Sequence, residues 1–329
     1  MKRTAKKISR SSVEGTLVQV ARLYYEGNLS QQEIADRLGV SRTLINLYLK
    51  HAREEGIVRV QIIDPTNSCI QLAADLKKIS GVKNITVVPN PRGAQTLSLR
   101  AVAGAAAEHI SSSLTDGAIF GLAWGRTTAT VAELLKPTRA RNVDAVPLLG
   151  DSGHSVAHSQ MNQLVMQAAQ RLGAKAHFLS LPMIVSSPEL RDALLKEEGI
   201  RDILHQWDRL TMACVGVGTV PPVPGMFVYI GKETLPGLMQ AGAVGDLSGI
   251  YYDRHGRIVP SGLENRKIAI AVEQLRSTKS IVAVASGDDR ALAVLGAMRS
   301  GLVSTLFIDQ SLAERILDEV AAEKPTATA

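Results

Sequence analysis

Residues Tyr24–Gly56 constrain this chain most, because they carry two short helical patterns joined by a tight turn. Ser30 stands three residues before Glu33, a spacing typical of a capping box at the start of a helix. Gly39 then favours a left-handed turn, and Ser41 can cap a second helix. Apolar residues recur along one side of that helix: Ile45, Tyr48, Leu49 and Ala52. This layout is typical of a DNA-binding helix-turn-helix, whose second helix enters the major groove.

The other side of the second helix has side chains that can bond to DNA. Arg42 suits guanine and Asn46 suits adenine, because each can make two hydrogen bonds to the base edge. We expect Thr43 to read bases with them, while Ser41 and Lys50 bind phosphates. The alternative is three ordinary amphipathic helices with a polar outer face.

The flanking residues favour a separate DNA-binding domain. The apolar spacing predicts a first helix over 13–26, and the alternating run at 57–63 predicts a strand that could form a wing. Residues 1–12 are basic and lack periodic apolar residues, so we expect a disordered arm. Residues 1–65 hold eleven Lys and Arg against seven Asp and Glu, which favours a polyanionic partner.

The length of the chain predicts two domains, since 329 residues are too many for one small core. The turn-forming run Asp-Pro-Thr-Asn at 64–67 marks the expected boundary. We therefore predict an arm at 1–12, a winged helix-turn-helix at 13–64 and a larger domain at 65–329.

The sequence does not indicate a membrane span, a metal site or a cofactor. It has no run of about twenty apolar residues, and no apolar core of a secretory signal follows its basic N-terminus. Cys69 and Cys214 stand far apart, which favours buried free thiols in a reducing cytoplasm. His154 and His158 have the spacing of a metal pair but no third ligand nearby, so capping or surface placement is the favoured interpretation.

Short apolar runs alternate with helical patterns through the larger domain. Strands are predicted at 85–88, 118–122, 145–149, 176–181, 210–217, 281–285 and 305–308. Helices are predicted at 68–79, 95–114, 127–135, 160–172, 289–299 and 310–321. This alternation predicts a doubly wound α/β domain whose mostly parallel sheet is covered on both faces.

Ligands of such sheets bind beyond the carboxyl ends of the strands. After the strand 118–122 the chain has Gly125, Arg126, Thr127 and Thr128, where glycine, hydroxyls and free amides at a helix start suit an anion. A tight strand-to-helix turn would explain the same glycine, and both interpretations stay open here.

Two further places could hold a ligand. Thr219 follows an apolar strand in the run Gly-Val-Gly-Thr-Val, which is too short for a dinucleotide fingerprint. Asp246 ends what reads as a helical segment, and Arg290 opens a helix after the strand 281–285. A carboxylate that binds hydroxyls and a guanidinium that binds a phosphate or carboxylate would suit a sugar or polyol derivative.

Over nearly its full length the chain resembles the SorC family of bacterial sugar-responsive transcription regulators. The resemblance lies in five segments, in this order: LYYEGNLSQQEIADRLGVSRTLINLYLKHAREEGIV, GLAWGRTTATV, VGVGTV, AVGDLSGIYYDRHGRIV and SGDDRALAVLGAMRSGLVSTLFIDQ. Its polyol-responsive members, such as erythritol or arabitol regulators, look most similar.

This resemblance implies a winged helix-turn-helix joined to an effector-binding and oligomerisation domain. That domain would be akin to the phosphosugar isomerase and glucosamine-phosphate deaminase fold, in a homo-oligomer that is usually a tetramer. A sugar, polyol or sugar phosphate would weaken its hold on operator DNA. Gly125, Thr127 and Thr128 would line the hydroxyl or phosphate subsite, Asp246 would face the ligand and Thr219 would lie on the neighbouring loop.

Three departures from the family pattern affect these expectations. Position 290 is commonly Lys, whereas this chain has Arg290, and position 47 is often Arg, whereas this chain has Leu47. After Leu149 some members have a Lys that forms a Schiff base with a sugar phosphate, and this chain has none there, so we expect noncovalent binding.

Two functions from different classes remain. The leading hypothesis is a DNA-binding regulator of a carbohydrate or polyol catabolic operon, without enzymatic activity. The alternative is a phosphosugar isomerase or deaminase with a DNA-binding appendage, in which Asp246 and His154 would transfer protons.

Overall fold

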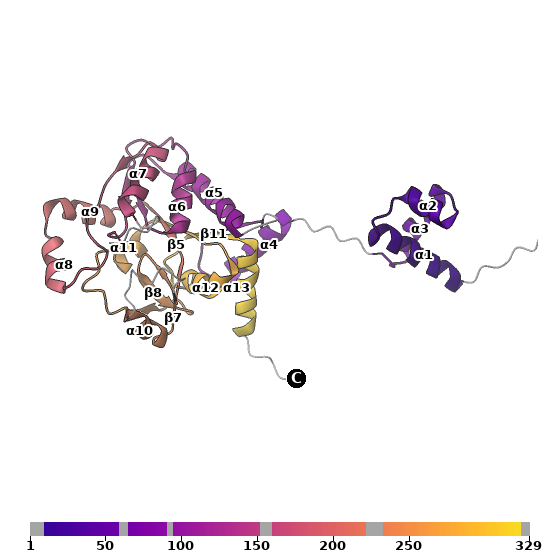
Figure 1. Ribbon diagram of the computed structural model, residues 1–329. Coiled ribbons are helices and arrows are strands. Elements are labelled where there is room, and N and C mark those ends of the chain that lie inside the picture. Colours follow the sequence, from indigo (N-terminus) through magenta and orange to yellow (C-terminus); the bar gives the residue numbers. More distant parts are fainter. Residues whose placement is uncertain (1–9, 59–64, 91–94, 152–159, 222–232, 324–329) are drawn as a thin grey trace, which may run out of the picture. The chain divides into compact units, whose positions relative to one another are not determined.

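Two units make up the chain, Met1–Asp64 and Pro65–Ala329. The computed structural model describes residues 10–58, 65–90, 95–151, 160–221 and 233–323 (Figure 1). Each unit buries apolar side chains of its own.

The N-terminal unit consists of helices α1 (Arg10–Tyr25), α2 (Gln31–Leu38) and α3 (Arg42–Glu54). The predicted capping box is confirmed, since the Ser30 hydroxyl accepts from the Glu33 amide and the Glu33 carboxylate accepts from the Ser30 amide. Gly39 has the left-handed φ of 65° that the turn requires. Local sequence signals therefore position α2 and α3 in this unit.

The expected disordered arm is wrong at its end, because α1 already begins at Arg10. No glycine or proline interrupts residues 10–12, so the helix extends back through them. The rest of the arm and most of the predicted wing strand lie outside the described residues.

A seven-stranded sheet forms the centre of the C-terminal unit. Its strand order is β1-β11-β10-β5-β2-β3-β4, and all its pairings are parallel. The strands are β1 (Asn84–Val88), β2 (Ile119–Leu122), β3 (Asp144–Pro147), β4 (Lys175–Ala176), β5 (Met212–Gly216), β10 (Ser280–Val284) and β11 (Thr305–Asp309). Every residue of β2 and β11 is buried, as expected of parallel strands covered on both faces.

Helices cover this sheet. Helix α5 packs on β1, β10 and β11, α6 on β5, and α7 on β3, while α4 and α13 pack on each other and on β1. The helices are α4 (Pro65–Lys78), α5 (Gln95–Ser113), α6 (Arg126–Leu134), α7 (Met161–Leu172), α8 (Pro188–Leu194), α9 (Glu198–Asp208), α10 (Thr234–Gln240), α11 (Val272–Ser277), α12 (Ala291–Arg299) and α13 (Gln310–Glu323), with a 3-10 turn, η2 (Asp288–Arg290), before α12. None of the helices described is long and apolar enough to span a bilayer.

A second, antiparallel sheet was not predicted. It has the order β6-β7-β8-β9, with β6 (Gly218–Thr219), β7 (Ala243–Leu247), β8 (Ile250–Asp253) and β9 (Ile258–Val259). The expectation that Asp246 ends a helical segment is wrong, since it lies in β7. Burial alternates along β7, with Ala243, Gly245 and Leu247 buried and the residues between them partly exposed, which is the period of a strand.

The strand predicted at 176–181 is also wrong, because β4 ends at Ala176. The side chain of Asn162, on α7, accepts a hydrogen bond of 3.0 Å from the Leu179 amide. Because the Leu179 amide is bound to this side chain, it does not pair with a neighbouring strand, and the chain has left the sheet at this point.

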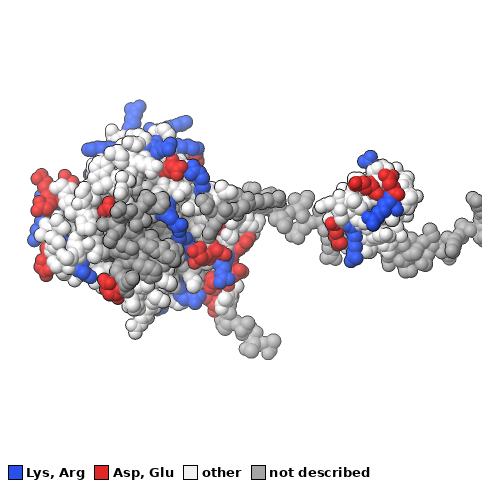
Figure 2. Space-filling model, in the orientation of Figure 1, with Lys and Arg blue, Asp and Glu red and all other residues white. Residues whose placement is uncertain are grey.

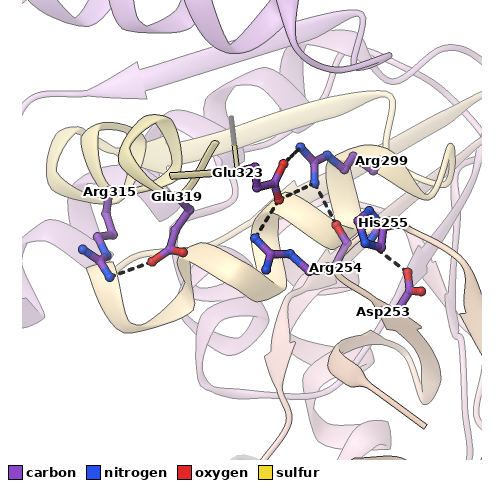
Figure 3. Close-up of polar contacts among 7 residues, drawn as sticks. All are labelled: Asp253, Arg254, His255, Arg299, Arg315, Glu319 and Glu323. Carbon is purple, nitrogen blue, oxygen red and sulfur yellow. Dashed lines mark hydrogen bonds and ion pairs between the residues drawn. The ribbon is translucent and has the colours of Figure 1, made fainter. Parts of the chain in front are cut away.

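The last helix is attached to the β8–β9 hairpin by a charged cluster (Figure 3). The two terminal guanidinium nitrogens of Arg299 donate to Glu323, at 3.0 and 2.8 Å, and Arg254 donates to the same carboxylate at 2.7 Å. Arg299 also donates to the Arg254 carbonyl. The two guanidinium groups lower the pKa of Glu323 to about 2, chiefly through the Arg299 hydrogen bonds.

We predict that Glu323→Gln lowers the free energy of unfolding by about 1 kcal/mol at neutral pH, the upper range for a solvent-screened ion pair. The pKa of Glu323 is depressed in the folded state. Its contribution is therefore fully present above the unfolded value of 4.5 and is lost as the pH falls towards about 2. Urea unfolding at several pH values measures the difference.

The matched control is Glu319→Gln on the same helix, where Arg315 and Glu319 form an i,i+4 pair (Figure 3). Such a pair contributes about 0.3–0.5 kcal/mol. An equal effect of both substitutions, or a Glu323→Gln effect independent of pH, would contradict the role of the cluster.

Candidate functional site

The polar face of α3 is open to solvent. Ser41, Arg42, Thr43, Asn46 and Lys50 are all exposed. The Ser41 hydroxyl caps the helix by accepting from the Leu44 amide at 3.3 Å. Lys50 lies 3.7 Å from Glu54, an exposed ion pair that a phosphate can replace.

The opposite face of α3 is packed into the unit. Ile45, Leu49 and Ala52 are buried, against residues of α1 and α2. This packing fixes which side of α3 faces outward and leaves the predicted base-reading side chains free to enter a groove.

Leu47, which stands where the family often has Arg, also lies on this surface. It is 45% exposed, between Thr43 and Lys50 on the outward side. An apolar side chain there can contact the methyl group of thymine.

Charge alone does not mark this surface. Figure 2 shows basic and acidic side chains side by side on the part of the N-terminal unit that faces the viewer. The assignment of a DNA-facing side therefore depends on the geometry of α3.

A pocket of about 990 Å³, part of it open to solvent, lies in the C-terminal unit where strands β2, β5 and β10 end. These three strands are neighbours in the sheet, so the loops that follow them meet. Strand β7 of the small sheet adds a further wall. Six of the seven residues predicted to bind a ligand line the pocket: Gly125, Arg126, Thr127, Thr219, Asp246 and Arg290.

Thr128 is the exception, and its predicted contact with the ligand is not supported. The residue is fully buried, and its hydroxyl donates to the Gly125 carbonyl at 3.0 Å. Thr128 therefore stabilises the turn at the start of α6 without reaching the pocket surface.

Asp246 lies in a close-fitting position. A Cβ atom on Gly218 would overlap the Asp246 carboxylate, so β6 approaches closely only because residue 218 is glycine. The carboxylate accepts from the Gly249 amide at 3.0 Å. Burial raises the pKa of Asp246, while this hydrogen bond and the charges of Lys267 and Arg290 oppose the rise.

Arg290 connects the loops that follow β5 and β10. Its guanidinium donates to the Val217 carbonyl at 2.7 Å. The loop before it is held by Asp309, whose carboxylate accepts from the Gly287 amide at 2.8 Å. Burial lowers the pKa of Arg290 and the positive charge of Arg126 lowers it further, while the negative charges of Asp289 and Asp246 oppose this shift. Two neighbouring cations favour an anionic group between them.

A second pocket adjoins the first and shares Arg126, Thr127 and Arg290 with it. Its wall also includes the Gln163 and Gln167 side chains of α7. Arg126 and Arg290 thus lie between the first pocket, which contains Asp246, and the second pocket, whose wall is more polar.

Sequence reasoning did not find two residues of this region, Ser248 and Lys267. Ser248 lines the first pocket. Lys267 donates to the Gly249 carbonyl at 2.7 Å, and burial lowers its pKa. No motif connects Lys267 to Asp246, so only the folded chain reveals their proximity.

The described residues offer no metal site, in that no group of three His, Cys, Asp or Glu side chains among them could hold an ion. His154 and His158 lie outside these residues. Cys69 and Cys214 are buried free thiols, as predicted, and burial raises the pKa of Cys214 to about 12.

We predict that Gly218→Ala lowers the free energy of unfolding by about 1–3 kcal/mol, the usual effect of overpacking. The added methyl group would overlap the Asp246 carboxylate, which the Gly249 amide holds in place. In the control Gly216→Ala, the new Cβ lies 3.7 Å from the Thr127 Cβ, an ordinary contact. Chemical denaturation compares the two variants, and equal stability would show that Asp246 moves freely.

Two family models match the sequence. Residues 64–318 match the family described as "Putative sugar-binding domain", and residues 21–59 match "Winged helix-turn-helix DNA-binding".

Two relatives are similar over most of the chain. The sorbitol operon regulator of Klebsiella pneumoniae is 29% identical over 305 residues, which cover 92% of this chain and 97% of the relative. The deoxyribonucleoside regulator of Bacillus subtilis (strain 168) is 27% identical over 305 residues, with the same coverage of both chains.

The fold is similar to a solved structure as well. The full-length sorbitol operon regulator SorC from Klebsiella pneumoniae matches with a TM-score of 0.73 and 28% identity, over 95% of this chain and 100% of that chain. The winged helix-turn-helix and the α/β domain with its parallel sheet agree with the fold predicted from the sequence.

Proposed function

We infer the function of this chain from its family, since it belongs to the SorC family of sugar-binding transcriptional regulators. We propose that an effector in the Asp246 pocket controls the affinity of the protein for the operator of a carbohydrate or polyol catabolic operon. The observation that carries the proposal is the convergence of Asp246, Thr127 and Arg290 on one open pocket. The isomerase or deaminase alternative loses support, since the relatives compared are transcriptional regulators.

The lining of the pocket suits a sugar, polyol or sugar phosphate. The Asp246 carboxylate accepts hydrogen bonds from hydroxyl groups, and Arg126 and Arg290 favour a phosphate or carboxylate. The name of the Klebsiella relative, a sorbitol operon regulator, supports a polyol. Thr219 and Thr127 add hydroxyl groups, and the amide of Gly125 lies at the start of α6.

Binding would be noncovalent. Among the residues described, no lysine lines the pocket. The amine of Lys267 is directed to the Gly249 carbonyl, where it supports the turn.

The N-terminal unit would read the operator through α3. Arg42, Thr43 and Asn46 face outward at its start and would contact bases. Ser41 and Lys50 would contact phosphates, which position the helix without reading the sequence.

Control would work by linkage between the two binding events. An effector that binds more tightly to one geometry of the protein shifts the population towards that geometry. When the operator binds the other geometry better, the effector weakens operator binding by the same factor by which the operator weakens effector binding. The protein would act in the cytoplasm as a homo-oligomer, with a tetramer expected from the family.

We predict that Arg42→Ala reduces discrimination between operator and random DNA by about 1–3 kcal/mol, because a bidentate contact to guanine is lost. The control Arg53→Ala removes the same charge about 16 Å further along α3. It should weaken operator and random DNA alike. Fluorescence anisotropy at one fixed salt concentration measures both, and equal losses on the two DNAs for Arg42→Ala would refute base reading.

We also predict that Asp246→Asn weakens effector binding by about tenfold to a hundredfold, because hydrogen bonds to a charged acceptor are the stronger ones. A thermal-shift screen of sugars, polyols and their phosphates supplies the compound, since a ligand stabilises the folded form by mass action. The control Asp253→Asn changes a carboxylate in β8 that bonds to the His255 and Arg257 amides. Retention of the full shift in Asp246→Asn would exclude Asp246 from the site.

A further inference from the structure

Ser248 occupies a strained position in the hairpin between β7 and β8. Leu247 pairs with Ile250, so Ser248 and Gly249 alone form the turn. Their φ angles are 54° and 75°, the left-handed values of a type I′ turn. Asn or Gly is favoured at the first position of such a turn, and serine is less stable there.

The neighbouring contacts hold this turn in place. The Gly249 amide donates to Asp246 at 3.0 Å, and Lys267 donates to the Gly249 carbonyl at 2.7 Å. Both polar groups of the Gly249 backbone are therefore bound to charged side chains. A turn fixed on both sides keeps Ser248 in its unfavourable conformation.

The side chain of Ser248 is buried without a partner. The residue is only 7% exposed, and its hydroxyl has no hydrogen-bond partner within the described ranges. By contrast, the Thr219 hydroxyl in the same pocket donates to the Pro221 carbonyl at 3.0 Å. A buried hydroxyl left unpaired is unfavourable, and such a group calls for an explanation.

We propose that Ser248 determines specificity by forming a hydrogen bond to a hydroxyl group of the bound effector. This inference rests on the proposed function, since it places Ser248 in the same pocket as Asp246. The strain and the unpaired hydroxyl of the free protein are then compensated when the ligand binds.

The surroundings of Ser248 select a hydroxyl over an anion. The Asp246 carboxylate belongs to the same hairpin, and its negative charge disfavours an anionic group beside it, while the Lys267 ammonium is bound to the Gly249 carbonyl. Leu149 and Met183, which also line the pocket, offer no charge. A serine hydroxyl can donate and accept, which matches the hydrogen bonding of an alcohol.

Ser248 and Asp246 together would therefore read the hydroxylated part of the ligand. An analogue that lacks the hydroxyl facing Ser248 would leave the buried serine unpaired, as it is in the free protein. Sites that hydrogen-bond a ligand hydroxyl reject the deoxy analogue for this reason.

The test is calorimetric titration of the full chain and of two variants, Ser248→Ala and Ser248→Gly. The probes are D-glucitol, D-arabitol, erythritol and ribose 5-phosphate, each with its single-deoxy analogues. Alanine removes the hydroxyl and keeps the side-chain strain, whereas glycine removes both, so the second variant remains informative if the first folds poorly.

Both variants should bind the best hydroxylated probe about tenfold more weakly than the wild type, the effect of one hydrogen bond. One deoxy analogue should bind to the wild type and to both variants alike, which identifies the hydroxyl that Ser248 reads. The free Ser248→Gly variant should also melt at a higher temperature than the wild type, because strain and an unpaired hydroxyl are both removed.

If the probes bind equally to the wild type and to both variants, the inference about Ser248 is wrong and the proposed function stands. If no probe binds to the wild type, the proposed function fails and this inference fails with it.

Discussion

The placement of the partly exposed Asp246 carboxylate between two backbone segments is the constraint on which the pocket depends. A charge that is drawn partly out of water is stable only when hydrogen bonds or opposite charges compensate for its lost hydration. Here the compensation comes from the Gly249 amide and from the charges of Lys267 and Arg290. Glycine at 218 lets β6 pass close beside the carboxylate. The small antiparallel sheet thereby becomes one wall of a cavity at the edge of the large one.

The large sheet supplies the opposite wall because its three central strands end together. Strands β10, β5 and β2 are neighbours, and the loop after each contributes to the pocket. The Arg290 hydrogen bond to Val217 joins two of these loops, and Asp309 anchors the loop that precedes Arg290. A ligand that contacts several loops at once can favour one arrangement of them, which is the requirement for a ligand-controlled change of state.

Parts of the structure set by neighbouring residues could be predicted from the sequence. The capping serines and Gly39 act over three or four residues, so the turn between α2 and α3 followed from spacing alone. The parallel strands followed from apolar runs, but β4 proved shorter because Asn162, which is distant in the sequence, binds the Leu179 amide. Which residues line the pocket was harder to predict. Thr128 belongs to a suitable motif, yet its hydroxyl turns back to the Gly125 carbonyl.

The residues missed in the pocket depend on features that spacing does not encode. The importance of Ser248 depends on a positive φ angle and a buried unpaired hydroxyl, and Lys267 meets the turn from eighteen residues along the chain. Asp246 was expected to end a helical segment and instead lies in β7, a strand that was missed because it is short and only every second residue is buried.

The central claim is that effector and operator binding are coupled through one equilibrium. The most direct measurement is titration of the best compound from the thermal-shift screen into the free protein and into the protein saturated with operator. The account predicts weaker effector binding to the operator complex, by the same factor by which the effector weakens operator binding. Equal effector affinity with and without operator would contradict it.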